Sequence, residues 1–183
     1  MRTVSRVSLP TRLIIALLPL LAWTAAARPA QADSSLGFGL HAWRTVDDLS
    51  SEGFTDIRRD GISYLVSYLY EPGALLKFEF DGEYYPNGFG GATHWAVSPE
   101  AYVLLGGFFY GGLGVGATYS KDFNHNLSSP FYAARVGLNL RLIPKLKLDV
   151  NANYRFHAFD ELKGADTGTV TLGAILRFGL GSR

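Results

Sequence analysis

The sequence predicts an eight-stranded antiparallel β-barrel that spans a membrane, preceded by a cleaved signal peptide. Three observations lead to this fold class. Eight segments alternate between apolar and polar residues, the connections between them alternate between short and long, and the first 32 residues have the layout of an export signal. No stretch after residue 32 approaches the roughly 20 consecutive apolar residues of a membrane-spanning helix. A closed barrel is the other structure that satisfies every backbone N–H and C=O group in hydrocarbon.

The clearest alternation runs through residues 146–157. Successive side chains of a strand point to opposite faces of its sheet, so every second residue shares a face. One face has Leu146, Leu148, Val150, Ala152, Tyr154 and Phe156, and the other has Lys147, Asp149, Asn151, Asn153, Arg155 and His157. A helix of this sequence would carry charge all round its circumference. The pattern therefore indicates a strand.

Seven further segments show the same period of two. The alternation is strong in residues 75–85, 131–141 and 169–178, and weaker in residues 36–43, 62–70, 94–105 and 109–119. Pro99 interrupts the segment 94–105, and proline cannot donate a ladder hydrogen bond, so a bulge or an early strand end is expected there. The total of eight is an even number, as a single-chain bacterial barrel requires.

The connections give a second and independent signal. Residues 71–74, 106–107 and 142–145 are short turns, whereas residues 45–60, 86–94, 120–130 and 158–168 are long and polar or glycine-rich. Bacterial membrane barrels have short turns in the periplasm and long loops outside the cell. With both chain ends in the periplasm, the first connection and every second one after it should be long. The sequence has this order.

Residues 1–32 are predicted to be a signal peptide, and residues 33–183 the barrel domain. An arginine-containing start precedes an apolar run of 11 residues at 13–23, which is too short to cross a bilayer as a helix. Residues 30–32 read Ala-Gln-Ala and place the cut before Asp33. A cut after Ala27 is less favourable because Pro29 follows closely. An uncleaved membrane anchor is the alternative.

Charge and cysteine content exclude several classes of protein. Four of the 17 Lys and Arg residues and none of the 16 Asp and Glu residues lie in 1–32, so the remainder carries a net charge of −3. This balance argues against nucleic acid as a partner, because nucleic acid requires a basic surface. The chain has no cysteine, which excludes a disulfide framework, a thiolate metal site and a cysteine-linked lipid anchor.

A soluble β-sandwich or lipocalin-like barrel would also alternate, but with apolar side chains inside and charge outside. Here one strand face collects nearly all the charge, which would make a poor soluble core, and the other face is apolar and needs lipid to cover it. Aromatic residues also fall near the ends of the expected strands, where the two aromatic girdles of a membrane barrel lie: Tyr70, Tyr84, Trp95, Tyr119, Tyr132, Tyr154, Phe156 and Phe178.

The charged face is expected to fill the interior, since an eight-stranded barrel is only wide enough for side chains. The inward charged residues would be Lys77, Glu79, Asp81, Glu83, Glu100, Arg135, Arg141, Lys147, Asp149, Arg155 and Arg177. Glu79, Asp81 and Glu83 form one acidic column, for which Arg135, Arg155 and Arg177 are the expected partners. The favoured interpretation is a salt-bridged plug, because buried charges persist only when they are paired. An ion or proton path is the alternative.

The sequence predicts no catalytic, cofactor-binding or metal site. His41, His94, His125 and His157 lie in separate segments without metal-ligand spacing. Asp122, His125 and Ser128 share one expected loop and would be needed for a hydrolase with a Ser-His-acid set, but no flanking motif fixes their geometry. The loop at 45–60 is rich in both charges and is the candidate for surface binding: Asp47, Asp48, Glu52, Asp56, Arg58, Arg59 and Asp60.

With this signal segment, the alternation in 146–157 and a terminal strand ending at Phe178, the chain resembles the outer-membrane β-barrel domain family, the small eight-stranded barrels of the OmpA/OmpX architecture. The resemblance implies location in the bacterial outer membrane, contact with its lipid and lipopolysaccharide, and insertion by the barrel-assembly machinery. A terminal aromatic residue is the expected assembly signal, and both Phe178 and Leu180 are candidates.

The function expected from the sequence is that of a monomeric integral membrane barrel without a large pore. Its role would be structural, or would be to bind at the cell surface through its extracellular loops. We expect it not to be an enzyme and to need no cofactor. A lipid A-modifying hydrolase and a small ion channel are the alternatives.

Overall fold

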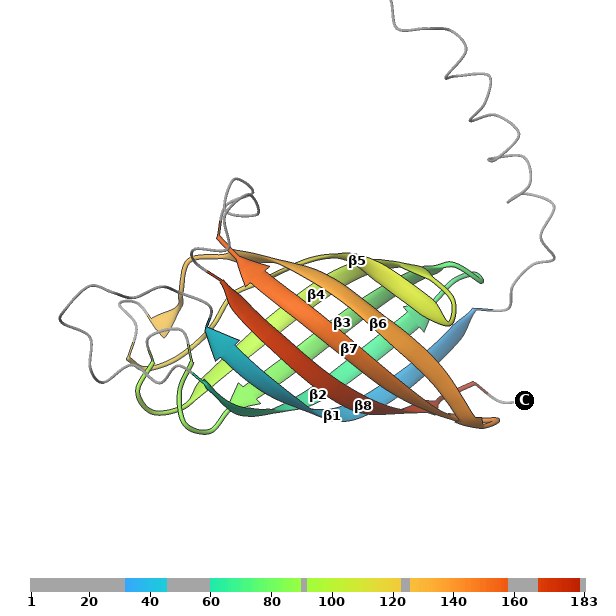
Figure 1. Cartoon of the computed structure of the whole chain (residues 1–183), viewed down its shortest axis with the longest axis horizontal. Coiled ribbons are helices and arrows are strands. Elements are labelled where there is room, and N and C mark those ends of the chain that lie inside the picture. The colour runs from blue at the N-terminus through green and yellow to red at the C-terminus, as the bar shows by residue number, and fades with distance from the viewer. Residues whose placement is uncertain (1–31, 46–59, 90–91, 123–125, 158–167, 182–183) are drawn as a thin grey trace, which may run out of the picture. The chain divides into compact units, whose positions relative to one another are not determined.

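The computed structural model describes residues 32–45, 60–89, 92–122, 126–157 and 168–181. These residues form one antiparallel sheet of eight strands that closes into a barrel, with each strand paired to the next and β8 paired back to β1 (Figure 1). The strands are β1 (Asp33–Thr45), β2 (Asp60–Glu71), β3 (Leu76–Tyr85), β4 (Ala96–Gly106), β5 (Phe109–Gly116), β6 (Phe131–Ile143), β7 (Leu146–Phe156) and β8 (Thr169–Gly179). The predicted fold class is confirmed, whereas the predicted signal peptide lies almost wholly outside the described residues. The described ranges contain no helix with the length and apolar character needed to cross a membrane.

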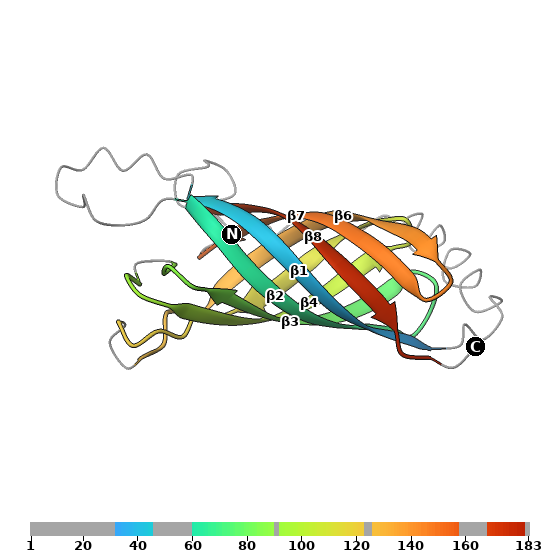
Figure 2. The same cartoon turned by 90° about the horizontal axis from the view of Figure 1, so that it is seen from below.

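The two ends of the barrel differ in the length of their connections. The short turns β2–β3, β4–β5 and β6–β7 lie at the same end as the start of β1 and the end of β8, here called the short-turn end (Figures 1 and 2). The strand ends that are joined by the connections β1–β2, β3–β4, β5–β6 and β7–β8 lie at the opposite end, here called the long-loop end. The predicted alternation of short and long connections is therefore confirmed.

The predicted division between the two strand faces is also confirmed, except that Arg141, expected among the inward charges, is exposed near the end of β6. On the outward face Val136 is 61% exposed and Leu172 is 62% exposed, although both lie within strands. On the inward face Arg135, Asp149 and Arg177 are each at most 1% exposed. A barrel that hides its charges and exposes its large apolar side chains is built for hydrocarbon rather than for water.

The sequence predicted a bulge or an early strand end at Pro99, and this prediction is wrong for the strand that contains it. The register of β4 against β3 continues without a shift from Leu105 to Ala96 and pairs Pro99 with Gly82. The interruption falls instead on β5, which ends at Gly116. The Pro99 carbonyl accepts the N–H of Ala117 at 3.3 Å, but proline has no N–H to donate in return. The regular β4–β5 ladder therefore stops opposite the proline.

Inward glycines explain how large side chains fit into so narrow a lumen. His41 is paired directly with Gly173, and Tyr110 with Gly137, on neighbouring strands. A Cβ atom on Gly173 would lie 1.7 Å from the ring of His41, and one on Gly137 would lie 2.4 Å from the Tyr110 hydroxyl oxygen. Each large ring thus lies over a residue that has no side chain. This arrangement lets rings and ion pairs occupy the same cross-section of the barrel.

Candidate functional site in the barrel lumen

Buried ion pairs fill the lumen in layers that follow the inward residues of β3. From the long-loop end to the short-turn end these residues are Tyr85, Glu83, Asp81, Glu79 and Lys77, all buried. The period of two along the strand places all five side chains on the inner face. We refer to the layers around Glu83, around Glu79 with Asp81, and around Lys77 as the upper, middle and lower layers.

In the upper layer, Arg155 joins two carboxylates that come from different strands. Its guanidinium nitrogen Nη2 lies 2.5 Å from Oε2 of Glu83 and 2.6 Å from Oε1 of Glu100. Glu83 also accepts a hydrogen bond from the Ser63 hydroxyl, and its Oε1 lies 3.1 Å from Nδ1 of His41. All these side chains are at most 4% exposed, so the charges are shielded from water and each carboxylate depends on the shared guanidinium.

The middle layer is built on Glu79, which two arginines share. Arg135 lies 2.8 Å from Glu79 and 2.7 Å from Asp81, and Arg177 lies 2.5 Å from Glu79 and 2.9 Å from Asp149. These contacts connect β3 across the lumen to β6 and β8, neither of which is its neighbour in the sheet, and Arg177 extends the network to Asp149 of β7. The layer therefore ties opposite walls of the barrel together.

Two inward tyrosines support the acidic partners. Tyr102 donates a hydrogen bond to Glu100, and the ring centroid of Tyr102 lies 3.8 Å from the Arg135 guanidinium carbon. Tyr110 donates a hydrogen bond of 2.6 Å to Asp149. A guanidinium over an aromatic face gains further electrostatic stabilisation where water is excluded.

The lower layer lies at the short-turn end and is a triad of one acid and two lysines. Glu71 accepts hydrogen bonds from Lys77 and Lys147, each at 2.7 Å, through its two different carboxylate oxygens. The sequence analysis placed Glu71 in the short turn 71–74. The structure instead makes it the last residue of β2.

The charges of the three layers nearly balance. Among the described residues the layers hold six carboxylates (Glu71, Glu79, Asp81, Glu83, Glu100 and Asp149) and five permanent cations (Lys77, Arg135, Lys147, Arg155 and Arg177). His41 is a further basic side chain in contact with this network. A nearly neutral interior lacks a strong field that would favour one sign of ion.

Aromatic residues cover the upper layer and form a cap made of Trp43, Tyr85 and Phe89. Tyr85 and Phe89 stack with centroids 4.2 Å apart, and Trp43 meets Phe89 edge-on at 5.1 Å. The guanidinium carbon of Arg155 lies 5.2 Å from the Phe89 ring centroid, just below the cap. Phe89 comes from the β3–β4 connection, so part of a loop contributes to the cap.

Asp122 holds that same connection in place from the β5–β6 loop. Its Oδ2 accepts the backbone N–H groups of Thr93 at 2.8 Å and His94 at 3.0 Å, together with the Thr93 hydroxyl at 3.1 Å. Nδ1 of His94 lies 3.1 Å from Oδ1. The hydrogen bonds from the His94 and Thr93 backbones lower the pKa of Asp122 to about 2, because they favour the charged carboxylate. We call this contact the Asp122 latch.

Sequence reasoning found the arginine partners of the acidic column but not the pairing. Arg135, Arg155 and Arg177 each contact a member of the column, as predicted. The shared roles of Glu100 and Asp149 and the contact of His41 with Glu83 were missed. Alternation indicates which residues face the lumen, but the contacts across it depend on the tilt and stagger of strands that are distant in sequence.

Two of the three residues that a hydrolase would need in the β5–β6 loop are described, and Asp122 and Ser128 have different partners. Asp122 is bonded to Thr93 and His94, while the Ser128 hydroxyl donates to the Ser129 carbonyl at 2.9 Å. No hydrogen bond links Asp122 to Ser128 within the described part of the chain. His125 and the charged stretch 46–59 lie outside the described residues. Across the described ranges, no group of three or more His, Cys, Asp or Glu residues is arranged to hold a metal ion.

Comparisons with known proteins give matches among solved structures alone. The sequence matches no protein-family model, and no curated protein matches it significantly. Among solved structures, Neisserial surface protein A superimposes with a TM-score of 0.53 at 15% identity, covering 80% of this chain and 97% of that one. Ail of Yersinia pestis superimposes with a TM-score of 0.49 at 18% identity, covering 81% of this chain and 99% of that one. The N-terminal β-barrel domain of OprF from Pseudomonas aeruginosa gives 0.46 at 12% identity, with 81% and 100% covered.

The fold shared with Neisserial surface protein A and the apolar exterior together define an outer-membrane β-barrel of the small eight-stranded type. The sequence identities are low, so this likeness concerns architecture and carries no activity with it.

The upper layer predicts a large effect of losing its arginine. Replacing Arg155 by Met should destabilise the barrel by about 3–5 kcal/mol, because Glu83 and Glu100 lose their shared cation while still buried. Adding Glu100→Gln should recover part of the loss, since Glu83 keeps His41 and Ser63. Urea unfolding in lipid vesicles, followed by tryptophan fluorescence, measures the change. Arg44→Met, at an exposed strand end, is the control, and equal stability of the two single variants would contradict the pairing.

The Asp122 latch predicts a pH dependence confined to the long-loop end. Because the pKa of Asp122 is about 2 in the folded protein and 3.8 ordinarily, the latch stabilises the loop above about pH 4. That contribution should decline below about pH 4 and be lost near pH 2. Asp122→Asn should weaken the latch at neutral pH, seen as lower hydrogen-exchange protection of the Thr93 and His94 amides. Lys121→Gln is the matched control, and unchanged protection in Asp122→Asn would disprove the latch.

Proposed function

We propose that this protein is an integral outer-membrane barrel with no large pore, which acts by binding at the cell surface through its extracellular loops. The observation that carries this proposal is the filled lumen. Three ion-paired layers and an aromatic cap occupy it from one end to the other. A transport role requires a path through the barrel, so a binding role falls to the loops at the long-loop end.

The proposed sidedness follows from the connections. The short-turn end would face the periplasm and the long-loop end the exterior, as in other bacterial barrels. The apolar outer face would then hold the loops at the level of the lipopolysaccharide headgroups. The stretch 46–59 carries four acidic residues and two arginines, a composition suited to divalent cations and to the phosphate groups they bridge. We therefore propose lipopolysaccharide as a partner.

Export and assembly complete the proposal. Residues 1–32 would direct export and be removed before Asp33, and the barrel-assembly machinery would insert the remaining chain as a monomer. Phe178 lies on the outward face of β8 and is 47% exposed, whereas Leu180 follows the strand and is 57% exposed. Both side chains are accessible, and both therefore stay candidates for the terminal assembly signal.

Electrical recording tests whether the lumen is closed. The purified barrel in a planar bilayer should show no stable, porin-sized openings. The variant with Trp43, Tyr85 and Phe89 all replaced by Ala should remain closed as well, because the three ion-paired layers still fill the barrel below the cap. Reproducible large openings of the unaltered protein would overturn the plugged-barrel proposal and favour a channel.

Lipopolysaccharide binding tests the role of the loops. Purified lipopolysaccharide with Ca²⁺ should raise the unfolding free energy of the barrel, by about 2.7 kcal/mol at a hundredfold excess over its Kd. In a variant with residues 46–59 replaced by a Gly-Ser linker of equal length, lipopolysaccharide should raise the unfolding free energy by a smaller amount. Phosphatidylcholine serves as the control lipid. Equal gains in the two proteins would show that this loop does not bind lipopolysaccharide.

A further inference from the structure

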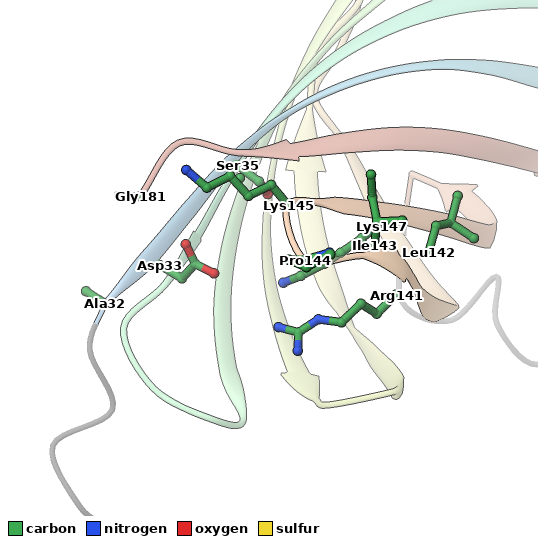
Figure 3. A pocket seen from close by; sticks show the side chains of 11 residues that line it. Ala32, Asp33, Ser35, Arg141, Leu142, Ile143, Pro144, Lys145, Lys147 and Gly181 are labelled. Atoms are coloured by element: carbon green, nitrogen blue, oxygen red, sulfur yellow. The ribbon is translucent and has the colours of Figure 1, made fainter. Parts of the chain in front are cut away.

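A recess with unpaired positive charge opens at the short-turn end, below the lower layer. It has a volume of about 530 Å³ and lies between the β6–β7 hairpin, the start of β1 and the end of β8 (Figure 3). Arg141, Lys145 and Lys147 line it from the hairpin, and Asp33 lines it from β1. Three cations thus face a single carboxylate.

Lys147 already has a carboxylate partner, whereas the other two cations do not. Lys147 shares Glu71 with Lys77, and one carboxylate therefore serves two lysines. Arg141 and Lys145 are exposed and form no ion pair with any described residue. Asp33 uses its Oδ1 to accept the N–H of Ser34 at 3.0 Å. The recess therefore has an excess of positive charge that an anionic group would balance.

The hairpin is shaped so that apolar side chains lie beside these cations. The β6–β7 register shifts between Arg141 and Ile143, because Arg141 pairs with Lys147 while Ile143 pairs with Leu146. The extra residue, Leu142, breaks the alternation, so that two consecutive apolar residues are exposed, Leu142 by 51% and Ile143 by 59%. Figure 3 shows Leu142 pointing away from Asp33 and Arg141. We call Leu142 and Ile143 the apolar lip.

The turn is also fixed in position before any ligand arrives. The Lys145 carbonyl accepts the N–H of Gly179 at 2.9 Å, which ties the hairpin to the end of β8. Pro144 restricts the backbone of the turn itself. The main chain that carries the two unpaired cations therefore needs little ordering on binding, and a smaller entropy loss favours affinity.

We propose that this recess binds the phosphate headgroup of an anionic phospholipid from the membrane leaflet at the short-turn end. Arg141 and Lys145 contact the phosphate, and the acyl chain lies against the apolar lip. Charge alone would suit any small anion, but the apolar lip lies at the end of a membrane-spanning strand, where headgroup and hydrocarbon meet. Basic pockets at the edge of a membrane protein are suited to acidic lipid headgroups.

Native mass spectrometry of the full barrel, released from detergent micelles, tests the proposal with phosphatidylglycerol as the probe and phosphatidylcholine as the reference lipid. The barrel should retain phosphatidylglycerol in preference. Arg141→Gln with Lys145→Gln should weaken that binding about thirtyfold. Each cation contributes about 1 kcal/mol of attraction to an anionic lipid, and a loss of about 2 kcal/mol corresponds to this factor. The control is Arg44→Gln with Lys121→Gln, which removes two exposed cations near the long-loop end and should leave binding unchanged.

Two further measurements distinguish a lipid site from a site for small free anions. Leu142→Ser with Ile143→Ser should also lower lipid retention, and inorganic phosphate should compete poorly because it has no acyl chain. Effective competition by inorganic phosphate would assign the recess to free anions and overturn the lipid proposal. Equal retention of the two lipids by the unaltered barrel, or equal losses in the test and control variants, would overturn it too. Heat-dependent gel mobility verifies that each variant is folded before binding is measured.

Discussion

The constraint on which this structure depends is that hydrocarbon offers no partner to a backbone amide. A sheet of eight strands has two edges, and each edge would present unpaired N–H and C=O groups to lipid. The pairing of β1 with β8 over eleven residue pairs removes both edges at once. Once the sheet is closed, alternation decides the rest, since every second side chain must be acceptable to lipid and every other one must fit a narrow interior.

That interior explains why so many charges lie inside a small protein. Eight strands leave room for side chains but not for a water column, so each inward polar group needs a partner from another wall. Glu79 meets this requirement by forming ion pairs with both Arg135 and Arg177. Arg155 meets it by forming ion pairs with both Glu83 and Glu100. Glycines such as Gly173 and Gly137 make room for the rings between the layers. Filling the lumen in this way leaves the two ends of the barrel as its accessible polar surfaces.

The parts of the structure that sequence reasoning predicted are those set by local rules. The period of two assigned the inward and outward residues of β7 and the acidic column of β3, because each depends only on neighbours within one strand. The predicted effect of Pro99 on its own strand was wrong. The missing N–H of a proline affects the neighbouring strand that would have accepted its hydrogen bond, and the sequence around the proline does not identify that neighbour. The Asp122 latch and the register shift after Arg141 lacked a sequence signal, since each depends on how two connections or strands meet in space.

The contacts across the lumen have a consequence for the order in which the barrel can assemble. A sheet that grows strand by strand from β1 reaches β3 early, with Glu79, Asp81 and Glu83 already on its inner face, while their arginines arrive only with β6, β7 and β8. Every partial barrel therefore carries carboxylates without partners, and each would have to stay hydrated until the last strands are in place. Dehydration of the interior is thereby coupled to completion of the sheet, so the last strand to pair also completes the removal of water from the lumen.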